Sequence, residues 1–428
     1  MFLGNAQIPL IDWENFNFFK EGYTGGAVDV YKPYGENIYR YDVNSLYPHI
    51  MDSTPMPVGT PTYFEGDILS MVKLDQIPNS LEPAVVNDND LRSQATDLNN
   101  KPFGIFEVEV TAPENLKTPI LQLRVKTQRG GTRTIAPIGN WTGVYFSEEI
   151  YNAMKYGYKF KVLRGYTFKQ EYIFSDFVNF LYEMKNNSEK NSPDYTISKL
   201  LLNSLYGRLG MNPEMEKNEI VDSNTSLKII EKHVVTNIIT FKNGKELISF
   251  FEDRPTEDDN TKRSKNISIP ISLAVTANAR VHMSQFKNIE GVEIYYSDTD
   301  SIDMNKPLDP EFVGKELGKM KLEHIFKKIV YLAPKVYGGK TEDYEYVKIK
   351  GAKVPVAFSD LEPLLYKSKT LEISQSKWYR DMGEGTINIK DELYTLSITD
   401  NKRKLVYDSN DRYSDTAPLK LVNGKIDD

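Results

Sequence analysis

The chain of 428 residues contains no cysteine, which excludes disulfide bonds, thiolate zinc sites and cysteine nucleophiles. It has no apolar run near the ~20 residues that a membrane-spanning helix requires. Its first four residues lack the basic start of a signal peptide, and no internal repeat or low-complexity tract interrupts the chain. The absence of cysteine fits a reducing compartment, and the absence of apolar runs predicts a protein without a membrane partner.

A folded core is predicted by what the chain does contain. Hydrophobic residues make up 40% of it and aromatic residues 12%, with 27 tyrosines, so the chain is globular and long enough for two or three lobes. A net charge of −7 excludes a protein that coats nucleic acid by bulk charge, but a local basic patch still allows a nucleic-acid enzyme. Basic residues cluster at 159–169, 348–353 and 402–404, and the simplest interpretation of each cluster is a solvated strand or turn.

Two acidic segments, Tyr41 to Pro48 and Tyr296 to Ser301, carry the most information in the chain. Each follows an apolar, strand-like run and contains carboxylates at its end. An extended or turn backbone aims Asp298 and Asp300 the same way, and Asp42 joins them if its strand lies alongside. Such a trio, completed by a backbone carbonyl, suits two Mg²⁺ ions ~3.5–4 Å apart. Alone, the acidic triplet is weak evidence, because surface loops often contain it.

Between these segments, residues 199–207 predict a helix with one polar stripe. Lys199, Asn203 and Tyr206 are spaced i, i+4 and i+7, so they share a face that can meet a triphosphate, a sugar and a base. Lys185, on the preceding helix, can offer a second phosphate contact. The alternative is an ordinary amphipathic helix whose polar face meets solvent.

Tyr47 follows Asp42 closely and precedes Pro48, which is expected to stop the strand. A bulky ring at this position would lie under the sugar of a bound nucleotide. It would exclude a ribose by contact with the 2′-hydroxyl, so that dNTPs are chosen over rNTPs. The alternative is that Tyr47 only packs at the end of a strand.

These three segments resemble motifs A, B and C of family B DNA polymerases, which read D-x-x-S-L-Y-P, K-x-x-x-N-S-x-Y-G and Y-x-D-T-D-S, in the same order. Further segments resemble the protein-primed branch of phages, adenoviruses and linear mitochondrial plasmids. Tyr23 to Gly26 is similar to its Y-x-G-G motif, Lys185 to Glu189 to its fingers lysine segment, and Lys335 to Tyr337 to its K-x-Y motif. Long stretches between motifs A and B, and between B and C, lie where that branch carries two insertions.

The resemblance, which covers about residues 20–410, implies an α+β fold. This fold is the right-hand polymerase, with an antiparallel β palm, short helical fingers, β-rich insertions and a small thumb. The expected divisions are 1–59 for the first part of the palm, 60–165 for a β-rich insertion of terminal-protein-region type, 166–210 for the fingers, 211–270 for a strand-displacement insertion, 271–354 for the rest of the palm, and 355–428 for the thumb and tail.

The resemblance also implies roles for single residues. The catalytic carboxylates would be Asp42, Asp298 and Asp300, which with Val43 would hold two Mg²⁺ ions, or Mn²⁺ in their place. Nucleotide-binding residues would be Tyr47, Lys185, Lys199, Asn203 and Tyr206, and DNA-binding residues would be Tyr23, Gly25, Gly26, Ser45, Lys335 and Tyr337. The partners would be template and primer DNA, dNTPs and a terminal protein that supplies the priming hydroxyl. The location would be the host cytoplasm for a phage polymerase and the mitochondrion for a plasmid polymerase.

Relatives in this branch carry an N-terminal proofreading exonuclease, whereas only about 20 residues precede Tyr23 here. The D-x-E of Asp12 to Glu14 is interpreted as coincidence, so proofreading within this chain is not expected. Two alternatives stay open. One is a family B polymerase that extends nucleic-acid primers or starts de novo. The other is a nucleic-acid-binding remnant without catalysis, against which the intact carboxylates and Lys199 speak.

Patterns outside the motifs predict the remaining elements. They indicate strand, turn and strand over the first 60 residues, a helix over 147–156, two helices around a break at 191–193, an irregular and β-rich stretch over 211–266, a helix over 271–285, and a hairpin that pairs 386–399 with 404–407.

Overall fold

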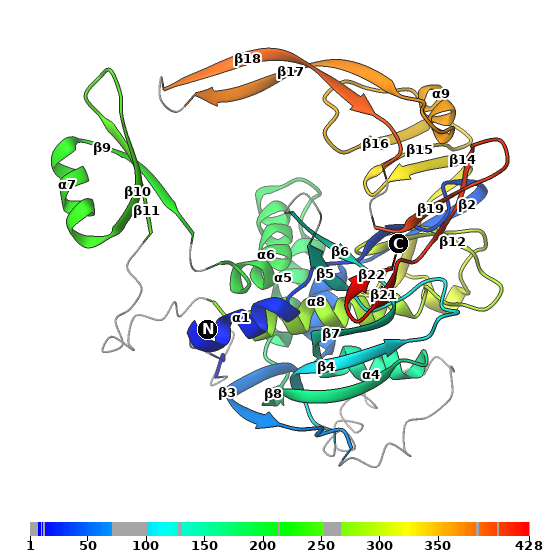
Figure 1. Cartoon of the computed structure of the whole chain (residues 1–428), viewed down its shortest axis with the longest axis horizontal. Helices are drawn as coiled ribbons and strands as arrows, with labels where there is room; N and C mark the ends of the chain where they lie inside the picture. Colours follow the sequence, from blue (N-terminus) through cyan, green and yellow to red (C-terminus); the bar gives the residue numbers. More distant parts are fainter. Residues whose placement is uncertain are drawn as a thin grey trace.

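A computed structural model describes residues 7–9, 11, 13–70, 101–126, 131–212, 215–251, 267–381, 385–399 and 402–427. Asp12 of the D-x-E triplet lies outside these residues. Within them, no helix is both long and apolar enough to cross a membrane. The chain forms a mixed α+β fold with several antiparallel sheets, as predicted (Figure 1).

The central sheet is antiparallel and has seven strands, in the order β1-β12-β13-β2-β14-β15-β16. Its strands are β1 (Val28–Val30), β2 (Tyr34–Val43), β12 (Ile294–Asp298), β13 (Ser301–Met304), β14 (Met320–Ala333), β15 (Val336–Lys340) and β16 (Glu345–Ile349). Because β12 and β13 lie between β1 and β2, the sheet places the two acidic segments side by side although they are far apart in sequence.

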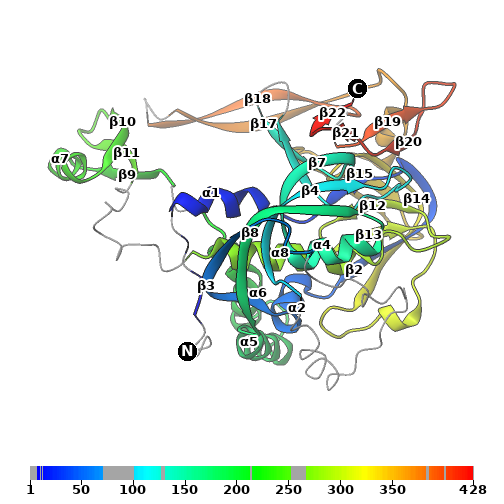
Figure 2. The same ribbon diagram turned by 60° about the horizontal axis from the view of Figure 1, so that its bottom comes forward.

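One face of this sheet packs against helices. Helix α8 (Ile269–Ser284) is buried along almost its whole length, and its apolar residues surround it on all sides, as in a helix enclosed by other elements. It shares a core with α2 (Leu46–Ser53) and with the β2 side chains of Tyr41 and Val43. Since side chains alternate along a strand, Arg40 and Asp42 point to the opposite face. Figure 2 shows α8 next to α2 and α6.

A six-stranded sheet forms a second layer, in the order β22-β21-β7-β4-β8-β3. Its strands are β3 (Met56–Glu65), β4 (Gly104–Ala112), β7 (Ile138–Phe146), β8 (Lys159–Glu171), β21 (Lys420–Val422) and β22 (Lys425–Ile426), with α4 (Ser147–Lys155) and the hairpin β5 (Leu123–Lys126) and β6 (Thr132–Ile135) beside it. Strand β3 runs across residue 60 and strand β8 across residue 165, the two boundaries that were expected for the first insertion. The C-terminal strand β21 pairs in parallel with β7 of this sheet. The sequence had indicated only a polar tail in this part of the chain.

The two helices predicted around residues 191–193 are α5 (Ser175–Asn187) and α6 (Pro193–Leu209). The Ser192 side chain accepts a hydrogen bond from Tyr195 N, and Pro193 takes the first helical position, which together start α6. The stretch after α6 contains β9 (Lys217–Val221), α7 (Ser223–Lys232), β10 (Val234–Thr240) and β11 (Glu246–Phe251). Helix α7, capped by Asp222, was not predicted within this β-rich stretch.

The hairpin predicted near the C-terminus is wrong in its pairing. Strand β18 (Thr386–Leu396) pairs along its whole length with β17 (Leu371–Asp381), whereas β19 (Lys404–Tyr407) pairs with β20 (Tyr413–Ala417). Strands β17 and β18 have equal length and a short connection with Gly385 in the left-handed region, so their pairing closes a smaller loop. The remaining elements are α1 (Trp13–Gly22), η3 (Pro310–Phe312), α9 (Phe358–Leu361) and η4 (Glu362–Leu365).

The first 60 residues also contain more helix than the predicted strand, turn and strand. Helix α1 precedes β1, and α2 begins at Leu46, three residues after β2 ends. Pro48 therefore lies in the first turn of a helix, where its missing N–H costs little, and does not stop a strand. The strand has already ended because Ser45 adopts the left-handed conformation, with φ 53°.

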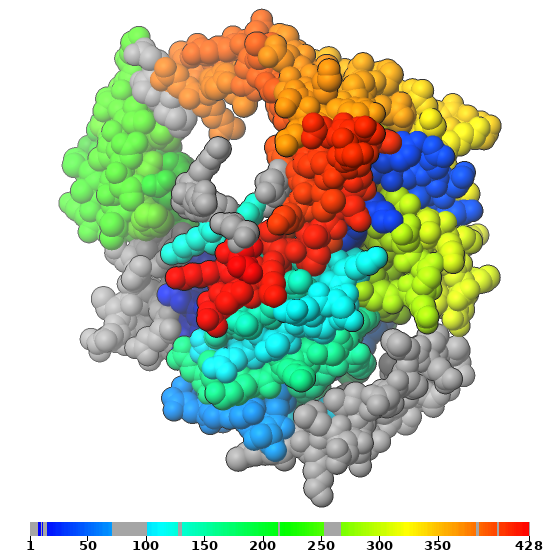
Figure 3. All heavy atoms as spheres, turned by 45° about the vertical axis from the view of Figure 1, so that its right-hand side comes forward, coloured from blue at the N-terminus to red at the C-terminus, as the bar shows by residue number. Residues whose placement is uncertain are grey.

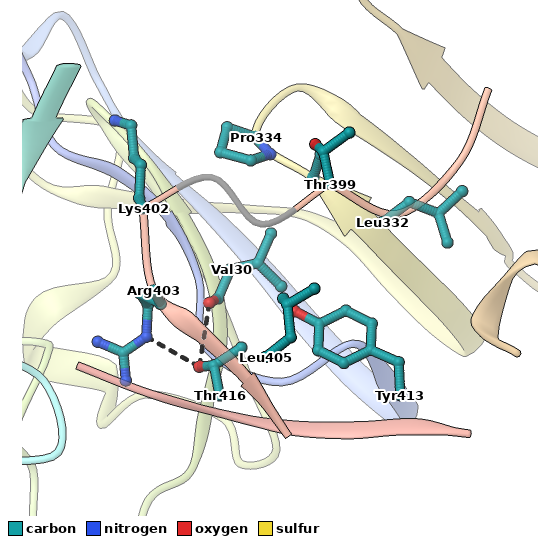
Figure 4. Close-up of a pocket in the computed structure, with 10 residues that line it drawn as sticks. Val30, Leu332, Pro334, Thr399, Lys402, Arg403, Leu405, Tyr413 and Thr416 are labelled. Atoms are coloured by element: carbon teal, nitrogen blue, oxygen red, sulfur yellow. Dashed lines mark hydrogen bonds between the residues drawn. The ribbon is translucent and has the colours of Figure 1, made fainter. Parts of the chain in front are cut away.

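The C-terminal segment contacts the chain just after β1 of the central sheet and then joins the second layer through β21. Thr416 Oγ1 donates to Tyr31 O at 2.7 Å, and Arg403 Nε donates to Thr416 Oγ1 at 2.8 Å. Figure 4 shows Arg403 and Thr416 at a small cavity also lined by Val30 and Tyr413, with a second hydrogen bond from Thr416 Oγ1 to Val30 O. None of the predicted site residues lines this cavity. The space-filling view in Figure 3 shows an opening between the β9–β11 unit and the β17–β18 hairpin, whose tip at Gly385 lies beside Phe241.

Candidate active site

The register of three strands gathers the predicted carboxylates at one end of the central sheet. Ser301 of β13 lies opposite Asp42 of β2 and also opposite Asp298 of β12. Asp300 lies in the tight turn between β12 and β13, where its N–H donates to Asp298 O at 2.7 Å. Its own carbonyl accepts a hydrogen bond from Val43 N at 2.8 Å, which ties the turn to the end of β2.

Burial and mutual repulsion both disfavour the charged forms of two carboxylates in the site. Burial raises the pKa of Asp42 to about 7, and the charges of Asp300 and Glu323 add to this effect. Burial also raises the pKa of Asp300, with further contributions from Asp298 and Glu323. Clustered hard oxygen donors of this kind fit a divalent cation, which would relieve the repulsion between them.

Glu323 was missed by the sequence interpretation. It lies on β14 at an irregularity in the pairing with β2, between Leu322, opposite Tyr41, and His324, opposite Arg40. A β-bulge places one extra residue against the partner strand and changes the direction of its side chain. The bulge thus explains why a glutamate of β14 acts on Asp42, and no sequence motif marks it.

Asp298 is held by the K-x-Y segment. Lys335 Nζ lies 2.7 Å from each carboxylate oxygen of Asp298, while Tyr296 Oη donates to Oδ2 at 3.2 Å. In the described part of the chain, no three acidic or histidine side chains are close enough together to hold one metal ion. Asp42 and Asp300, whose charges influence each other, are thus candidate ligands for a divalent ion, and Asp298 would join them by turning from Lys335.

Two predicted nucleotide-binding tyrosines lie in direct contact. The ring of Tyr47, from α2, stacks on the ring of Tyr206, from α6, with centroids 4.1 Å apart. Burial raises the pKa of both hydroxyls, so both stay neutral and able to donate hydrogen bonds. Motifs A and B therefore meet through this pair of rings. Tyr47 is held there because α2 begins three residues after β2 ends.

The two predicted lysines lie near each other on α5 and α6. Burial lowers the pKa of Lys185, and the charge of Lys199 lowers it further. Lys185 Nζ also lies 3.4 Å from Ser45 Oγ, which links α5 to the segment of motif A. Lys199 and Asn203 are exposed, whereas Ser198 and Leu202 face the core. A pair of neighbouring cations beside a carboxylate cluster suits a polyanion such as a triphosphate.

The predicted Y-x-G-G segment packs against the acidic turn. A Cβ added at Gly26 would lie 2.6 Å from Thr299 Cγ2, so only glycine allows this approach, while Gly25 has open space around its Cα. Thr299 N donates to Ala27 O at 2.9 Å. Tyr23 packs at the end of α6, where its hydroxyl would lie 2.6 Å from a Cβ on Gly210.

Arg280 of α8 was also missed. It donates to Thr24 O at 2.7 Å and to Gly25 O at 2.9 Å, and it forms a buried ion pair with Glu149 of α4 at 2.8 Å. The signal in the sequence was a lone arginine in a helix rich in apolar residues, since a buried charge needs a partner. Its partner lies 131 residues away and could not be identified from the sequence.

Tyr337 lies on the same sheet face as the carboxylates. Its ring centroid lies 4.4 Å from the guanidinium of Arg40 and 5.1 Å from the ring of Tyr296. All predicted site residues fall within the described part of the chain. Contacts and charges connect most of them in one region that combines carboxylates, two lysines and a stacked tyrosine pair, and the Asn203 side chain lies exposed on α6 with no hydrogen bond to the other described site residues. Such a region can bind divalent cations and a nucleoside triphosphate together.

The chain is similar to known proteins in sequence and in structure. Residues 3–290 match the family described as DNA polymerase type B, organellar and viral. A probable DNA polymerase of Neurospora intermedia is 40% identical over 395 residues, which are 91% of this chain and 38% of that protein. The DNA polymerase of Bacillus phage Nf is 25% identical over 345 residues, which are 78% of this chain and 51% of that protein.

Among solved structures, Phi29 DNA polymerase complexed with primer-template DNA and incoming nucleotide substrates is similar, with a TM-score of 0.59 and 20% sequence identity. The match covers 92% of this chain and 64% of that one, and it shows the fold. The predicted right-hand polymerase fold is thereby confirmed. Together with the family match, these similarities show that the chain belongs to the organellar and viral family of type B DNA polymerases.

Proposed function

We propose that this chain is the polymerase portion of a template-directed DNA polymerase, active on dNTPs by metal-assisted nucleotidyl transfer. The observation that carries the proposal is the convergence of Asp42 and Asp300 with two fingers lysines around a stacked tyrosine pair. The chain spans 38% and 33% of the lengths of two fungal relatives, so the proposal concerns the activity of a longer protein of this type.

Asp42, Asp300 and the backbone carbonyl of Val43 would hold the ions, with Asp298 as a further ligand. Bound Mg²⁺, or Mn²⁺ in its place, lowers the pKa of an attacking hydroxyl and balances the charge of the leaving pyrophosphate. Lys185 and Lys199 would bind the triphosphate oxygens, and their mutual repulsion is relieved when that anion arrives. Lys335, with Tyr337, would hold the primer terminus once it leaves Asp298.

Tyr47 would select the sugar of the nucleotide. Its ring is fixed by the stack on Tyr206, so it cannot swing away from a nucleotide that lies between the carboxylates and α6. A fixed ring excludes a 2′-hydroxyl by contact more effectively than a free one. Asn203, which is exposed on α6 like the lysine of the same motif, would also bind the nucleotide.

Template and primer DNA would cross the sheet face that carries Asp42. Tyr23, Gly25 and Gly26 would guide the template strand, with Ser45 at the start of α2. The β17–β18 hairpin would serve as the thumb. The β9–β11 unit, whose tip meets that hairpin, would serve as the strand-displacement insertion.

Initiation on a protein hydroxyl is the further part of the proposal. The Y-x-G-G and K-x-Y segments support it, as does the similarity to phage and fungal polymerases. The competing possibility is a family B polymerase that extends nucleic-acid primers only. Incubation with labelled dATP, with and without a candidate terminal protein, separates the two, because only protein priming labels the terminal protein.

The test of polymerase activity is extension of a hairpin primer across a blocked duplex in the presence of Mg²⁺. The proposal predicts full-length product beyond the block, which reports polymerisation and strand displacement together. No extension of the primer by the full-length protein would refute the proposed function. Extension that stops at the block would refute the strand-displacement part alone.

A further inference from the structure

A buried ion pair lies next to the carboxylates on the same face of the central sheet. Arg40 of β2 and Asp303 of β13 are directly opposite in register, with Nε 2.7 Å from Oδ1 and Nη2 2.5 Å from Oδ2. Their side chains are only 3% and 1% exposed. Tyr331 Oη donates a further hydrogen bond to Asp303 Oδ2 at 2.5 Å. Both oxygens of this buried carboxylate are therefore paired with donors.

The Arg40–Asp303 pair lies two residues from Asp42 along β2 and two residues from Ser301 along β13. Side chains two residues apart on a strand point to the same face, so Arg40 shares its face with Asp42. Across the strands, Ser301 is opposite Asp42 just as Asp303 is opposite Arg40. The position of this pair along β2 and β13 therefore determines how Asp42 lies relative to the turn that carries Asp300.

The guanidinium of Arg40 also packs against rings from the strands beyond β2. Its Cζ lies 5.2 Å from the ring centroid of Phe326, 4.4 Å from that of Tyr337 and 5.6 Å from that of Tyr346. These rings belong to β14, β15 and β16. One side chain thus links the strand of motif A to the strand of motif C and to the tyrosine of the K-x-Y segment.

A buried ion pair seldom stabilises a fold more than a well-packed apolar pair of the same size. Its presence here therefore needs a reason besides stability. A slip of β2 by one residue would turn Arg40 to the apolar face that packs on α8, and a slip by two would separate it from Asp303. Either slip would break the two hydrogen bonds between Arg40 and Asp303, because they require a fixed geometry. Apolar side chains at the two positions would tolerate a slip better.

We propose that Arg40 is a positioning residue for the two-metal site. Its pair with Asp303 sets the register of β2 against β13, and so the separation of Asp42 and Asp300, and its guanidinium seats Tyr337 beside Tyr296. This inference rests on the proposed function, because the carboxylates must hold metal ions for their separation to matter.

The experiment compares Arg40→Met/Asp303→Leu, which replaces the pair with apolar side chains, with Arg40→Lys and wild type. Mn²⁺ binding without DNA is measured from the loss of the free-ion signal in electron paramagnetic resonance, and the Mg²⁺ concentration for half-maximal primer extension is measured separately. We expect both to worsen by about 10- to 100-fold in the double variant, the range found when side chains that orient metal ligands are removed. Arg40→Lys keeps the charge but not the fork of donors, so we expect a smaller loss in the same direction.

The matched control is Lys32→Met/Glu293→Gln, which removes an exposed ion pair, 2.5 Å long, at the margin of the same sheet. It should leave both readouts unchanged. A double variant with a wild-type circular dichroism spectrum and Mn²⁺ affinity within about threefold of wild type overturns the proposal. If the double variant does not fold, Arg40→Lys decides, and unchanged Mn²⁺ affinity in it overturns the proposal. A failure of the proposed function is distinct, because wild type would then bind Mn²⁺ but extend no primer.

Discussion

Lys335 Nζ lies 2.7 Å from both carboxylate oxygens of Asp298. The lysine is fixed in this position by its backbone, which has φ 63° and donates from N to Tyr296 Oη at 3.0 Å. The same hydroxyl donates to Asp298 Oδ2. The first carboxylate of the acidic turn is therefore paired with a cation from a segment 37 residues away, and that cation would compete with a metal ion for the same oxygens.

Lys335→Ala should separate metal binding from primer extension. Without the competing ammonium, Asp298 is free to turn toward Asp42 and Asp300, so Mn²⁺ binding in the absence of DNA should tighten by about tenfold, or about 1.4 kcal/mol. Primer extension should nevertheless slow, because the residue proposed to hold the primer terminus is lost. Calorimetric titration with Mn²⁺ and a single-nucleotide extension assay measure the two effects. Lys340→Ala, which removes an exposed ion pair between β15 and Glu345 of the neighbouring strand β16, should change neither. Weaker Mn²⁺ binding in Lys335→Ala would contradict the competition.

Metal should stabilise the protein more as the pH rises. The pKa of Asp42 is about 7 in the folded chain, whereas its ordinary value is 3.8. Between these two pH values the folded state binds more protons than the unfolded state. The contribution of Asp42 to stability therefore falls as the pH increases from about 3.8 to about 7. A divalent ion binds the ionised carboxylate and offsets the loss. The increase in melting temperature caused by Mg²⁺ should thus be larger at about pH 8 than at about pH 6. Asp42→Asn should remove most of this pH dependence, and an equal Mg²⁺ effect at both pH values in wild type would count against it.

Tyr47→Val should admit ribonucleotides. Removal of the ring opens the space that a 2′-hydroxyl would enter, so the ratio of rNTP to dNTP incorporation should rise by at least about tenfold, equivalent to about 1.4 kcal/mol. Tyr47→Phe keeps the ring and its stack on Tyr206, so its selectivity should stay close to that of wild type. Steady-state incorporation of each nucleotide on one primer-template measures the ratio. Selectivity that is equal in the valine and phenylalanine variants would assign the gate to another residue.

The fold was predictable where one element carried a strong periodic or motif signal. The helix expected at 271–285 is α8, and the helices expected around 191–193 are α5 and α6, because a buried apolar run and a Ser-Pro cap are local signals. Pairing across long distances was not predictable. Strand β17 was overlooked, so β18 was paired with β19, and the parallel addition of β21 to β7 brings together residues that no local pattern connects.

The same division holds in the site. Motif spacing singled out Asp42, Asp298 and Asp300, and the sheet register places them together. Arg280 and Glu323 escaped notice because they act only through tertiary placement. Arg280 reaches two backbone carbonyls and a glutamate on another helix, while Glu323 depends on a bulge in β14.

Gly139→Ala should detach the C-terminal strand. A Cβ at Gly139, where φ is +93°, would lie 2.1 Å from Leu421 O, so β21 could no longer lie beside β7. Gly66→Ala is the matched control, because its φ of +96° brings similar backbone strain but no atom lies within 4 Å. Gly139→Ala should cost about 1–3 kcal/mol more than Gly66→Ala in urea unfolding and should speed hydrogen exchange in residues 418–427. Equal costs in the two variants would show that the strand pairing contributes little.

The central claim is that Asp42 and Asp300 hold the metal ions that drive nucleotide addition. The most direct measurement is the single-turnover rate of one labelled dNTP addition to a primer-template with Mg²⁺, for wild type, Asp42→Asn and Asp300→Asn. Asp343→Asn, in the exposed turn after β15, controls for loss of an acidic residue elsewhere. We predict a fall of at least about a thousandfold in each site variant and none in the control, as for other residues that act together in catalysis. A rate within about tenfold of wild type in folded Asp300→Asn would contradict the claim.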